Sequence, residues 1–214
     1  MANIEIICGD SLEVMKTFPD NHFDLCLTDP PYGKKYARGK NGFGSAETSQ
    51  FSIKDVQWDA KTPSKEYFSE IFRVSKNQVI WGMNYFIEHL TSTNCVFVWD
   101  KLTGENPYAD CELAWASYNS VVKKFTKLWL GSHAHRSDEI LHPTQKPREL
   151  MIWCLKQAGD VKTVLDPFAG SGTTGVACEA LGIDCTLVEI NEKYVQDIHK
   201  RVQEEKDKMG LFPE

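Results

Sequence analysis

Residues 163–189, TVLDPFAGSGTTGVACEALGIDCTLVE, contain the pattern from which the fold class follows. Its β-branched and apolar start predicts a strand over Thr163–Asp166, followed by a glycine-rich turn and a helix at about 172–182. A second strand is predicted over Cys185–Glu189. A strand, a glycine turn, a helix and a second strand in this order form the unit from which parallel α/β sheets are built.

The glycines at 170, 172 and 175 have the G-x-G-x-x-G spacing, in which a tight turn lets a nucleoside approach the backbone. Glu189 follows by about 20 residues, the offset at which an acid binds ribose hydroxyls in dinucleotide folds. Asp166 opens the turn, however, and a carboxylate is poorly placed for a pyrophosphate, which needs N–H donors and positive charge. A cationic ligand suits it better. We therefore expect S-adenosylmethionine, which carries an ammonium and a sulfonium group, in preference to NAD.

Short β-rich runs alternate with helical periods along the chain, which predicts a mostly parallel sheet with helices on both faces. Further strands are expected at Ile4–Cys8, Phe23–Thr28, Gln78–Trp81, Cys95–Trp99, Cys111–Ser117 and Lys124–Leu130. Further helices are expected at about 11–16, 63–75, 83–91, 145–158 and 191–207. Segments 33–57 and 131–143 lack periodicity, so we expect one domain, 1–214, that carries two long functional loops.

The composition is that of a globular protein, with 42% apolar and 25% charged residues. No signal-peptide pattern opens the sequence and no apolar run is long enough to cross a bilayer, so we expect a cytoplasmic protein without membrane contact. Seven cysteines without a C-x-x-C pair predict reduced thiols, and the histidines lack metal-binding spacing. The net charge of −6 excludes binding to nucleic acid through a global positive field, so such a role requires local basic patches.

A second motif, Asp29-Pro30-Pro31-Tyr32, directly follows the apolar run LCLT. Two consecutive prolines cannot continue a strand, because both lack an N–H and fix φ. Asp29 should therefore stand at the carboxyl end of a buried strand, where ligands bind in open α/β sheets. The Asp29 carboxylate, the Pro30 carbonyl and the Tyr32 ring then offer two acceptors beside an aromatic face.

Two acceptors beside an aromatic plane suit an exocyclic amino group on a planar base. Hydrogen bonds from both N–H groups favour a tetrahedral nitrogen with a localised lone pair, and the carboxylate stabilises the positive charge that develops there. Stacking on an aromatic ring is worth about 1–3 kcal/mol in proteins that bind single strands. The plainer alternative for this tetrapeptide is a stiff turn whose aspartate caps a helix.

The chain resembles the S-adenosylmethionine-dependent DNA amino-methyltransferases of the permuted class, in which the catalytic half precedes the cofactor half. The resemblance is carried by GDSLEVMKTFPDNHFDLCLTDPPYG at 9–33, HPTQKP at 142–147, DPFAGSGTTGVACEALG at 166–182 and EINEKYVQDIHKRV at 189–202. WGMNYF at 81–86 and NPYADCELAW at 106–115 look like segments of small phage-type or orphan DNA adenine methylases. The resemblance implies a Rossmann-like methyltransferase fold and methyl transfer to a base flipped out of DNA.

The resemblance also implies roles for single residues. Asp29 to Tyr32 would hold the target base, and cofactor contacts would come from Asp10, His142, Thr144, Gln145, Lys146, Asp166, Phe168, Gly170, Gly172, Thr173 and Glu189. Asp10 would reach the cofactor adenine, Glu189 the ribose hydroxyls, and the 144–146 segment the methionine carboxylate. The plainer alternatives are that Asp10 is a helix N-cap and that 142–147 is an ordinary helix start.

DNA contacts are expected from two basic loops, through phosphate-binding side chains at Lys34, Lys35, Arg38, Lys40, His133, His135 and Arg136. The alternative for each loop is that it is a solvated surface segment without a role in DNA binding. Larger members of the family carry a sizeable target-recognition insertion, and this sequence has no such insertion beyond the two loops. We therefore expect short or relaxed sequence specificity, or specificity shared across a homodimer.

The expected target is adenine N6, because a DPPY tetrad that begins with Asp is more typical, by resemblance, of adenine enzymes than of cytosine N4 enzymes. Cytosine N4 remains the first alternative. Less favoured alternatives are methylation of RNA or of a protein amide, and a nicotinamide-dependent oxidoreductase, which the glycine turn alone would allow.

Overall fold

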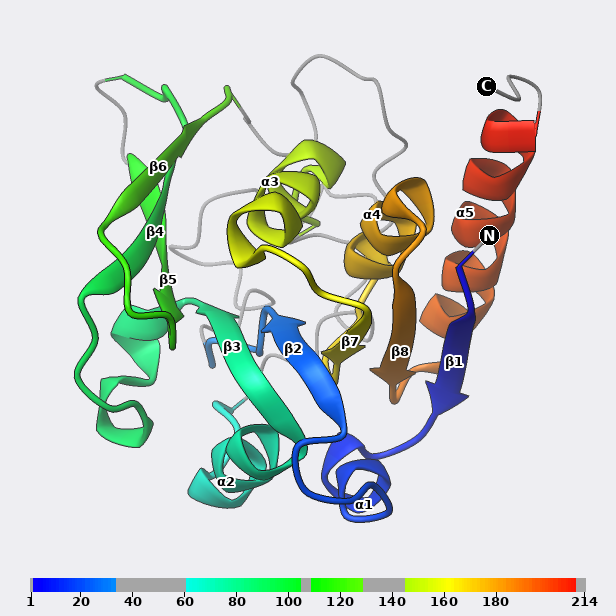
Figure 1. Ribbon diagram of the computed structural model, residues 1–214, viewed down its shortest axis with the longest axis horizontal. Coiled ribbons are helices and arrows are strands. Elements are labelled where there is room, and N and C mark those ends of the chain that lie inside the picture. The colour runs from blue at the N-terminus through cyan, green and yellow to red at the C-terminus, as the bar shows by residue number, and fades with distance from the viewer. Residues whose placement is uncertain (1, 34–60, 105–108, 129–144, 211–214) are drawn as a thin grey trace, which may run out of the picture.

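The computed structural model describes residues 2–33, 61–104, 109–128 and 145–210. An eight-stranded sheet with the strand order β1-β8-β7-β2-β3-β5-β4-β6 forms its centre (Figure 1). The strands are β1 (Ile4–Cys8), β2 (Phe23–Thr28), β3 (Ser75–Trp81), β4 (Cys95–Asp100), β5 (Cys111–Ala116), β6 (Lys123–Thr126), β7 (Thr163–Asp166) and β8 (Asp184–Glu189). The α-helices are α1 (Ser11–Met15), α2 (Lys65–Val74), α3 (Arg148–Ala158), α4 (Thr173–Leu181) and α5 (Glu192–Gly210).

Within the described sheet, β5 alone runs against its neighbours. It pairs antiparallel with β3 and β4, whereas all the other neighbouring strands pair in parallel. Strand β4 therefore runs in the same direction as β3, and all strands except β5 end at one edge of the sheet. The prediction of a mostly parallel sheet is confirmed, and the reversal of β5 brings its first residues to that same edge.

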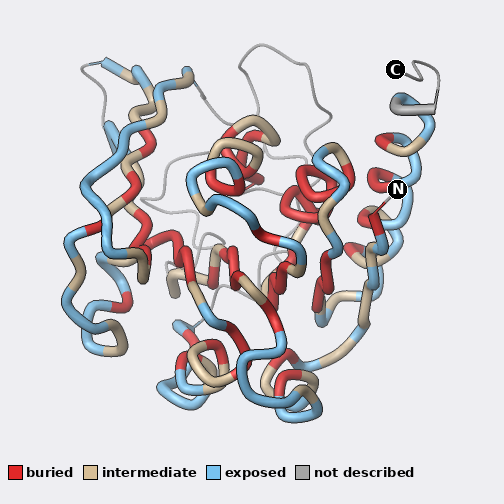
Figure 2. Tube along the Cα trace, in the orientation of Figure 1, coloured by how far each residue is buried: buried red, intermediate tan, exposed pale blue. Residues whose placement is uncertain are grey.

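Helices cover both faces of the sheet, as predicted: α3, α4 and α5 lie on one face, α1 and α2 on the other (Figure 1). Alternate residues of β2 point to the two layers, because successive side chains of a strand face opposite ways. Leu25 and Leu27 belong to the core beneath α3, α4 and α5, whereas Cys26 belongs to the core beneath α1 and α2. Figure 2 shows the resulting buried centre. A strand buried on both faces needs a nearly continuous apolar run, which LCLT supplies.

Most predicted elements are present, with boundaries that shift by a few residues. Strands β1, β2 and β7 begin and end as predicted. Helix α2 begins two residues after Pro63, and α3 begins at Arg148 with Pro147 as its N-cap residue. Strand β6 ends at Thr126, before the predicted end at Leu130.

The prediction of a helix at 83–91 is wrong. Met83–Tyr85 and Ile87–His89 form two short 3₁₀ turns, separated by Phe86 in a non-helical conformation. Gly82 begins the first turn with φ of 75°, and the backbone hydrogen bonds span three residues, from Tyr85 N to Gly82 O and from His89 N to Phe86 O. The apolar spacing of the segment reflects the burial of Phe86 and not a continuous helical face.

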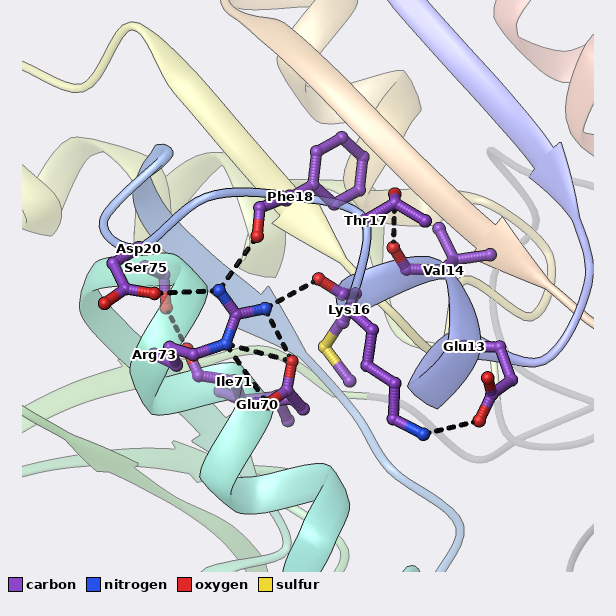
Figure 3. A network of polar contacts seen from close by, with 11 residues as sticks. Glu13, Val14, Lys16, Thr17, Phe18, Asp20, Glu70, Ile71, Arg73 and Ser75 are labelled. Atoms are coloured by element: carbon purple, nitrogen blue, oxygen red, sulfur yellow. Dashed lines mark hydrogen bonds and ion pairs between the residues drawn. The ribbon is translucent and has the colours of Figure 1, made fainter.

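Arg73, in the last turn of α2, ties this helix to the end of α1 (Figure 3). Its guanidinium donates hydrogen bonds to the carbonyls of Met15 at 2.9 Å and Phe18 at 2.8 Å. It also pairs with Glu70 at 2.6 Å and Asp20 at 2.9 Å. The last carbonyls of a helix have no partner within the helix, and Met15 is the last residue of α1. Arg73 therefore supplies a donor to the end of α1 and to the Phe18 carbonyl just beyond it.

Replacing Arg73 with Met should lower the free energy of unfolding by about 1–3 kcal/mol, because two carbonyls and Glu70 lose their charged donor. The Arg73 side chain is 29% exposed, so water recovers part of this loss. Urea unfolding measures the change. The matched control is Lys16→Met, which removes an exposed ion pair with Glu13 on α1 and should change stability much less. Equal effects of the two substitutions would contradict this role of Arg73.

Candidate active site at the carboxyl edge of the sheet

A cavity of about 350 Å³ lies at the edge where the parallel strands end. From β2 the chain passes through α2 to β3 on one side, and from β7 through α4 to β8 on the other. Because β2 and β7 are neighbours, the crossovers diverge between them, and ligands bind at such points in α/β sheets. The cavity size falls within the range of about 300–1,000 Å³ that is typical of small-molecule sites.

Four predicted acids meet at this cavity, each at or just beyond the end of a different strand. Asp10 follows β1, Asp29 follows β2, Asp166 ends β7 and Glu189 ends β8. The structure thus brings the early tetrapeptide and the late glycine turn to one site. Predicted residues that line the cavity are Asp10, Asp29, Pro31, Gln145, Lys146, Asp166, Phe168, Gly170, Thr173 and Glu189.

Backbone N–H groups hold the Glu189 carboxylate at the wall of the cavity. Gly170 N donates to Oε2 and Asn191 N donates to Oε1, both at 2.8 Å. Burial raises the pKa of Glu189, and these two hydrogen bonds oppose the rise. Each oxygen keeps a further acceptor position, so a fixed carboxylate is available for two hydroxyl donors of a ligand.

Asp166 is buried where β7, β2 and the glycine turn meet. Its carboxylate accepts hydrogen bonds from the hydroxyls of Thr28 at 2.8 Å and Thr174 at 2.6 Å, and from Phe168 N at 3.1 Å. Burial raises the pKa of Asp166 to about 6, although the three hydrogen bonds act in the opposite direction. The residue therefore joins two strands to α4 as well as lining the cavity. Sequence reasoning considered only its charge toward a ligand.

Asp10 is an N-cap, as the plainer alternative holds. Its carboxylate accepts hydrogen bonds from Leu12 N at 2.8 Å and Glu13 N at 3.4 Å. The Tyr67 hydroxyl of α2 also donates to Asp10 Oδ2 at 3.1 Å, and the Tyr67 ring lies 5.8 Å from that of Phe168. Asp10, Tyr67 and Phe168 together form an aromatic part of the cavity wall with a carboxylate beside it. Sequence analysis missed Tyr67, because a tyrosine in an amphipathic helix carries no motif.

Arg201 of α5 supports the glycine turn from behind. Its Nη1 donates to the carbonyl of Ser171 at 2.5 Å, to the Ser171 hydroxyl at 3.1 Å and to the Thr173 hydroxyl at 3.2 Å. Arg201 is 9% exposed, so these contacts are made largely away from water. Arg201 lies in the stretch 189–202 that carries the family resemblance, but the sequence analysis gave this side chain no role.

Gly172, one of the predicted cofactor residues, packs against α5. It does not line the cavity, and a Cβ atom built on it would lie 2.8 Å from the Ile198 side chain of α5. Its φ of 76° is also left-handed. Close packing of the turn on α5 therefore explains the need for glycine at this position.

The Asp29-Pro30-Pro31-Tyr32 segment leaves β2 at the cavity. Pro30 is buried, and Tyr32 lies beside the cavity lining, where its hydroxyl donates to Asp29 Oδ1 at 2.5 Å. The Tyr32 ring stacks on Tyr85 with 4.7 Å between centroids and 19° between planes. A Cβ atom on Gly82 would lie 2.1 Å from this ring, so the Gly82 backbone fits directly against it. Tyr85 and Gly82 thus hold the tyrosine that orients Asp29.

Lys146 lies against the tetrapeptide. Its Nζ is 2.5 Å from Asp29 Oδ2 and 3.2 Å from the Tyr32 hydroxyl. Sequence analysis assigned this lysine to the methionine carboxylate of a cofactor, whereas the structure pairs it with the proposed catalytic acid. Burial raises the pKa of Asp29, and the charge of Lys146 opposes this rise.

Several predicted residues lie outside the described residues: Lys34, Lys35, Arg38, Lys40, His133, His135, Arg136, His142 and Thr144. The loops predicted at 33–57 and 131–143 fall there too, except for Gly33. In the part of the chain that the structure describes, no cluster of His, Cys, Asp or Glu could hold a metal ion, and no helix could cross a membrane. All seven cysteines are free thiols.

The chain is similar to DNA methylases by sequence. The N6/N4 DNA methylase family model matches residues 100–200. The type II methyltransferase M.HpaI of Haemophilus parainfluenzae is 27% identical, over 94% of this chain and 74% of that protein. The type II methyltransferase M.HinfI of Haemophilus influenzae is 26% identical, over 93% of this chain and 68% of that protein.

Solved structures with the same fold include the M1.HpyAVI–SAM complex, with a TM-score of 0.58 and 21% identity over 92% of this chain and 99% of that one. The cytosine-N4-specific PvuII DNA methyltransferase has a TM-score of 0.61 and 15% identity, over 97% of this chain and 91% of that one. These likenesses confirm the expected Rossmann-like methyltransferase fold.

The raised pKa of Asp166 predicts a pH dependence of stability. Between about pH 4 and 6 the folded protein keeps a proton that the unfolded chain has lost, so the free energy of unfolding should fall as pH rises through this window. Above pH 6 this contribution should be constant. A pKa difference of about 2 corresponds to about 3 kcal/mol.

Other carboxyl groups titrate in the same window, so the informative quantity is the difference in unfolding free energy between wild type and Asp166→Asn. From pH 4 to pH 7 this difference should move by about 2–3 kcal/mol to the disadvantage of the wild type. Denaturant titrations at several pH values measure it. Parallel stability curves for the two proteins would show that Asp166 does not titrate in this window.

Proposed function

We propose that the chain, which is similar in sequence to N6/N4 DNA methylases, transfers a methyl group from S-adenosylmethionine to N6 of adenine in DNA. The observation that carries the proposal is the position of Asp29. Its carboxylate lies on the wall of the cavity that also holds the glycine turn and Glu189. A carboxylate that can accept a hydrogen bond from an amino group therefore lies beside the part of the cavity that is suited to a nucleoside.

The residues of the cavity fit S-adenosylmethionine. The fixed Glu189 carboxylate matches two ribose hydroxyls, and Phe168, Tyr67 and Asp10 provide aromatic and acceptor groups for an adenine. Asp29 and Asp166 add negative charge at a site that would take a sulfonium. When bound, the cofactor supplies an electrophilic methyl group on a leaving group that departs neutral.

Asp29 would accept a hydrogen bond from the base amino group and stabilise the positive charge that grows on its nitrogen. Tyr32 and Lys146 each occupy one position on an Asp29 oxygen, which leaves further acceptor positions for the base. The nitrogen–carbon bond forms as the carbon–sulfur bond breaks, and the amino group loses a proton afterwards. No proton needs to leave before attack, so Asp29 acts as an orienting and stabilising group.

DNA would be held by the basic segments that begin at Lys34 and at His133, and the protein would act in the cytoplasm, where cysteines stay reduced. A homodimer would extend this contact surface. Adenine is favoured because the tetrapeptide begins with Asp. Cytosine N4 is the second candidate, since a cytosine-N4-specific enzyme shares the fold.

The first test is the identity of the product. Purified protein is incubated with labelled S-adenosylmethionine and genomic DNA from a host without DNA methyltransferases, and the nucleosides are separated by chromatography with mass detection. N6-methyladenine is expected. N4-methylcytosine would establish the second candidate. Parallel incubations in which RNA or protein takes up label and DNA does not would refute action on DNA.

In the same assay Asp29→Asn should lower the methyl-transfer rate by about 10²–10³-fold, the usual effect of removing one group that stabilises developing charge. The control is Asp24→Asn on the same strand. Asp24 bonds to Lys76 and Thr163 and does not line the cavity, so its variant should keep the wild-type rate. An Asp29→Asn protein as active as wild type would remove Asp29 from catalysis.

Glu189→Gln should raise the Kd for S-adenosylmethionine by about tenfold or more, which corresponds to about 1.4 kcal/mol. The glutamine side chain has one oxygen and one NH₂ group, so its NH₂ group faces either Gly170 N or Asn191 N, which are both donors. One backbone N–H therefore loses its acceptor, and the side chain turns away from the ligand. Calorimetric titration measures this effect, with exposed Glu192→Gln as the control. A Kd within twofold of wild type would contradict the role, and binding of NAD alone by wild type would refute the cofactor.

A further inference from the structure

Four charged side chains form a connected group that ends at Asp29. Lys146 Nζ lies 2.5 Å from Asp29 Oδ2 and 3.0 Å from Glu112 Oε2, and Lys101 pairs with the other oxygen of Glu112. The Lys146 side chain is 5% exposed, and the other three side chains are 17–21% exposed. The group is therefore largely removed from water, where charges interact more strongly.

The reversed direction of β5 brings this group together. Glu112 is near the beginning of β5, so it lies at the edge where β2 and β4 end. In the sheet Glu112 is opposite Trp99, and Lys101 directly follows β4. Lys146 reaches the group from the segment before α3, at the same edge. A parallel β5 would place Glu112 at the opposite edge of the sheet, away from Asp29.

The surroundings of Lys146 leave its charge dependent on the two acids. The rings of Tyr32 and Trp81 each lie 5.6 Å from Nζ, in positions that favour a cation. Burial disfavours the charged form of Lys146, but Asp29 and Glu112 outweigh this effect and raise its pKa. With both acids present, Lys146 is thus a cation held between two carboxylates.

The two carboxylates are not equivalent. Burial opposes the ionisation of Glu112, yet Lys146 and Lys101 together lower its pKa to about 2. Asp29 has Lys146 as its cation, and burial and the negative charge of Glu112 both raise its pKa. Glu112 is therefore fixed as an anion, whereas the charge of Asp29 depends on the balance of its neighbours.

We propose that Glu112 and Lys146 are positioning residues for Asp29: Glu112 anchors the Lys146 ammonium, which keeps the Asp29 carboxylate ionised and aligned at the cavity wall. The inference deepens the proposed function and rests on it, because an ionised Asp29 is needed to stabilise charge on the amino group. Glu112 is assigned here by contact and charge alone.

Charge balance makes the proposal specific. In the wild type the formal charges of the two acids and the two lysines sum to zero. Lys146→Met leaves two acids with one lysine, Glu112→Gln leaves one acid with two lysines, and the double variant returns to zero. The other groups near Asp29 are the Tyr32 hydroxyl and Asp166, and all these variants retain them.

The experiment measures the single-turnover methyl-transfer rate as a function of pH. The rate should fall on the acid side as Asp29 gains a proton. In Lys146→Met the midpoint of this fall should move up by at least about 1 pH unit, the effect of losing an adjacent opposite charge. In Glu112→Gln it should move down, and in the double variant it should return to within about 0.5 unit of wild type.

Lys127→Met is the matched control. Lys127 pairs with Glu149 of α3 and has no contact with Asp29, so its variant should keep the wild-type midpoint. Binding of S-adenosylmethionine is measured alongside. The Kd of Lys146→Met should stay within about threefold of wild type, whereas a lysine that binds the methionine carboxylate would raise it by tenfold or more.

The outcomes separate the inference from the proposed function. An active Lys146→Met with an unmoved midpoint, or a double variant no closer to wild type than the single one, would overturn the inference and leave the function standing. If Lys146→Met does not fold, the Glu112→Gln midpoint alone decides, and an unmoved value overturns the inference. A wild type that does not methylate DNA refutes the proposed function itself.

Discussion

The contact between Asp166 and Thr28 is the constraint on which the site depends, because it joins the two strands from which the chain diverges. Strand β2 carries the tetrapeptide and β7 carries the glycine turn, and 138 residues of sequence separate the two partners. Thr174 fixes the same carboxylate to the start of α4. A buried acid with three donors therefore sets the distance between the two halves of the site. Its raised pKa reflects the free energy that this arrangement costs.

The sequence predicts an element of the fold best where the local residues are compatible with only one backbone structure. Strand β2 is a short apolar run that two prolines terminate, and β7 ends at a glycine turn, so their boundaries are correct. At 83–91 the pattern was ambiguous, because one buried aromatic, Phe86, produces the spacing of a helix without forming one.

The residues of the candidate site also divide into those that local sequence predicts and those that it does not. Asp10, Asp29, Asp166 and Glu189 were predictable, because each follows a recognisable strand and strand ends share an edge. Glu112 was not, because local sequence does not state the direction in which a strand enters a sheet. Tyr67 and Arg201 were missed for a related reason: both reach the site from helix surfaces, and a single polar side chain on a helix has no periodic signal.

The support that α5 gives to the glycine turn has a consequence for how the chain can be shortened. Ile198 fills the space beside Gly172, and Arg201 bonds to Ser171 and Thr173, so one helix supplies both the packing and the donors. A fragment that stops after β8 would keep the tetrapeptide and the glycine turn but lose the packing and the donors that hold this turn. In this protein the integrity of the ligand site thus depends partly on two side chains of α5 that do not themselves line the cavity.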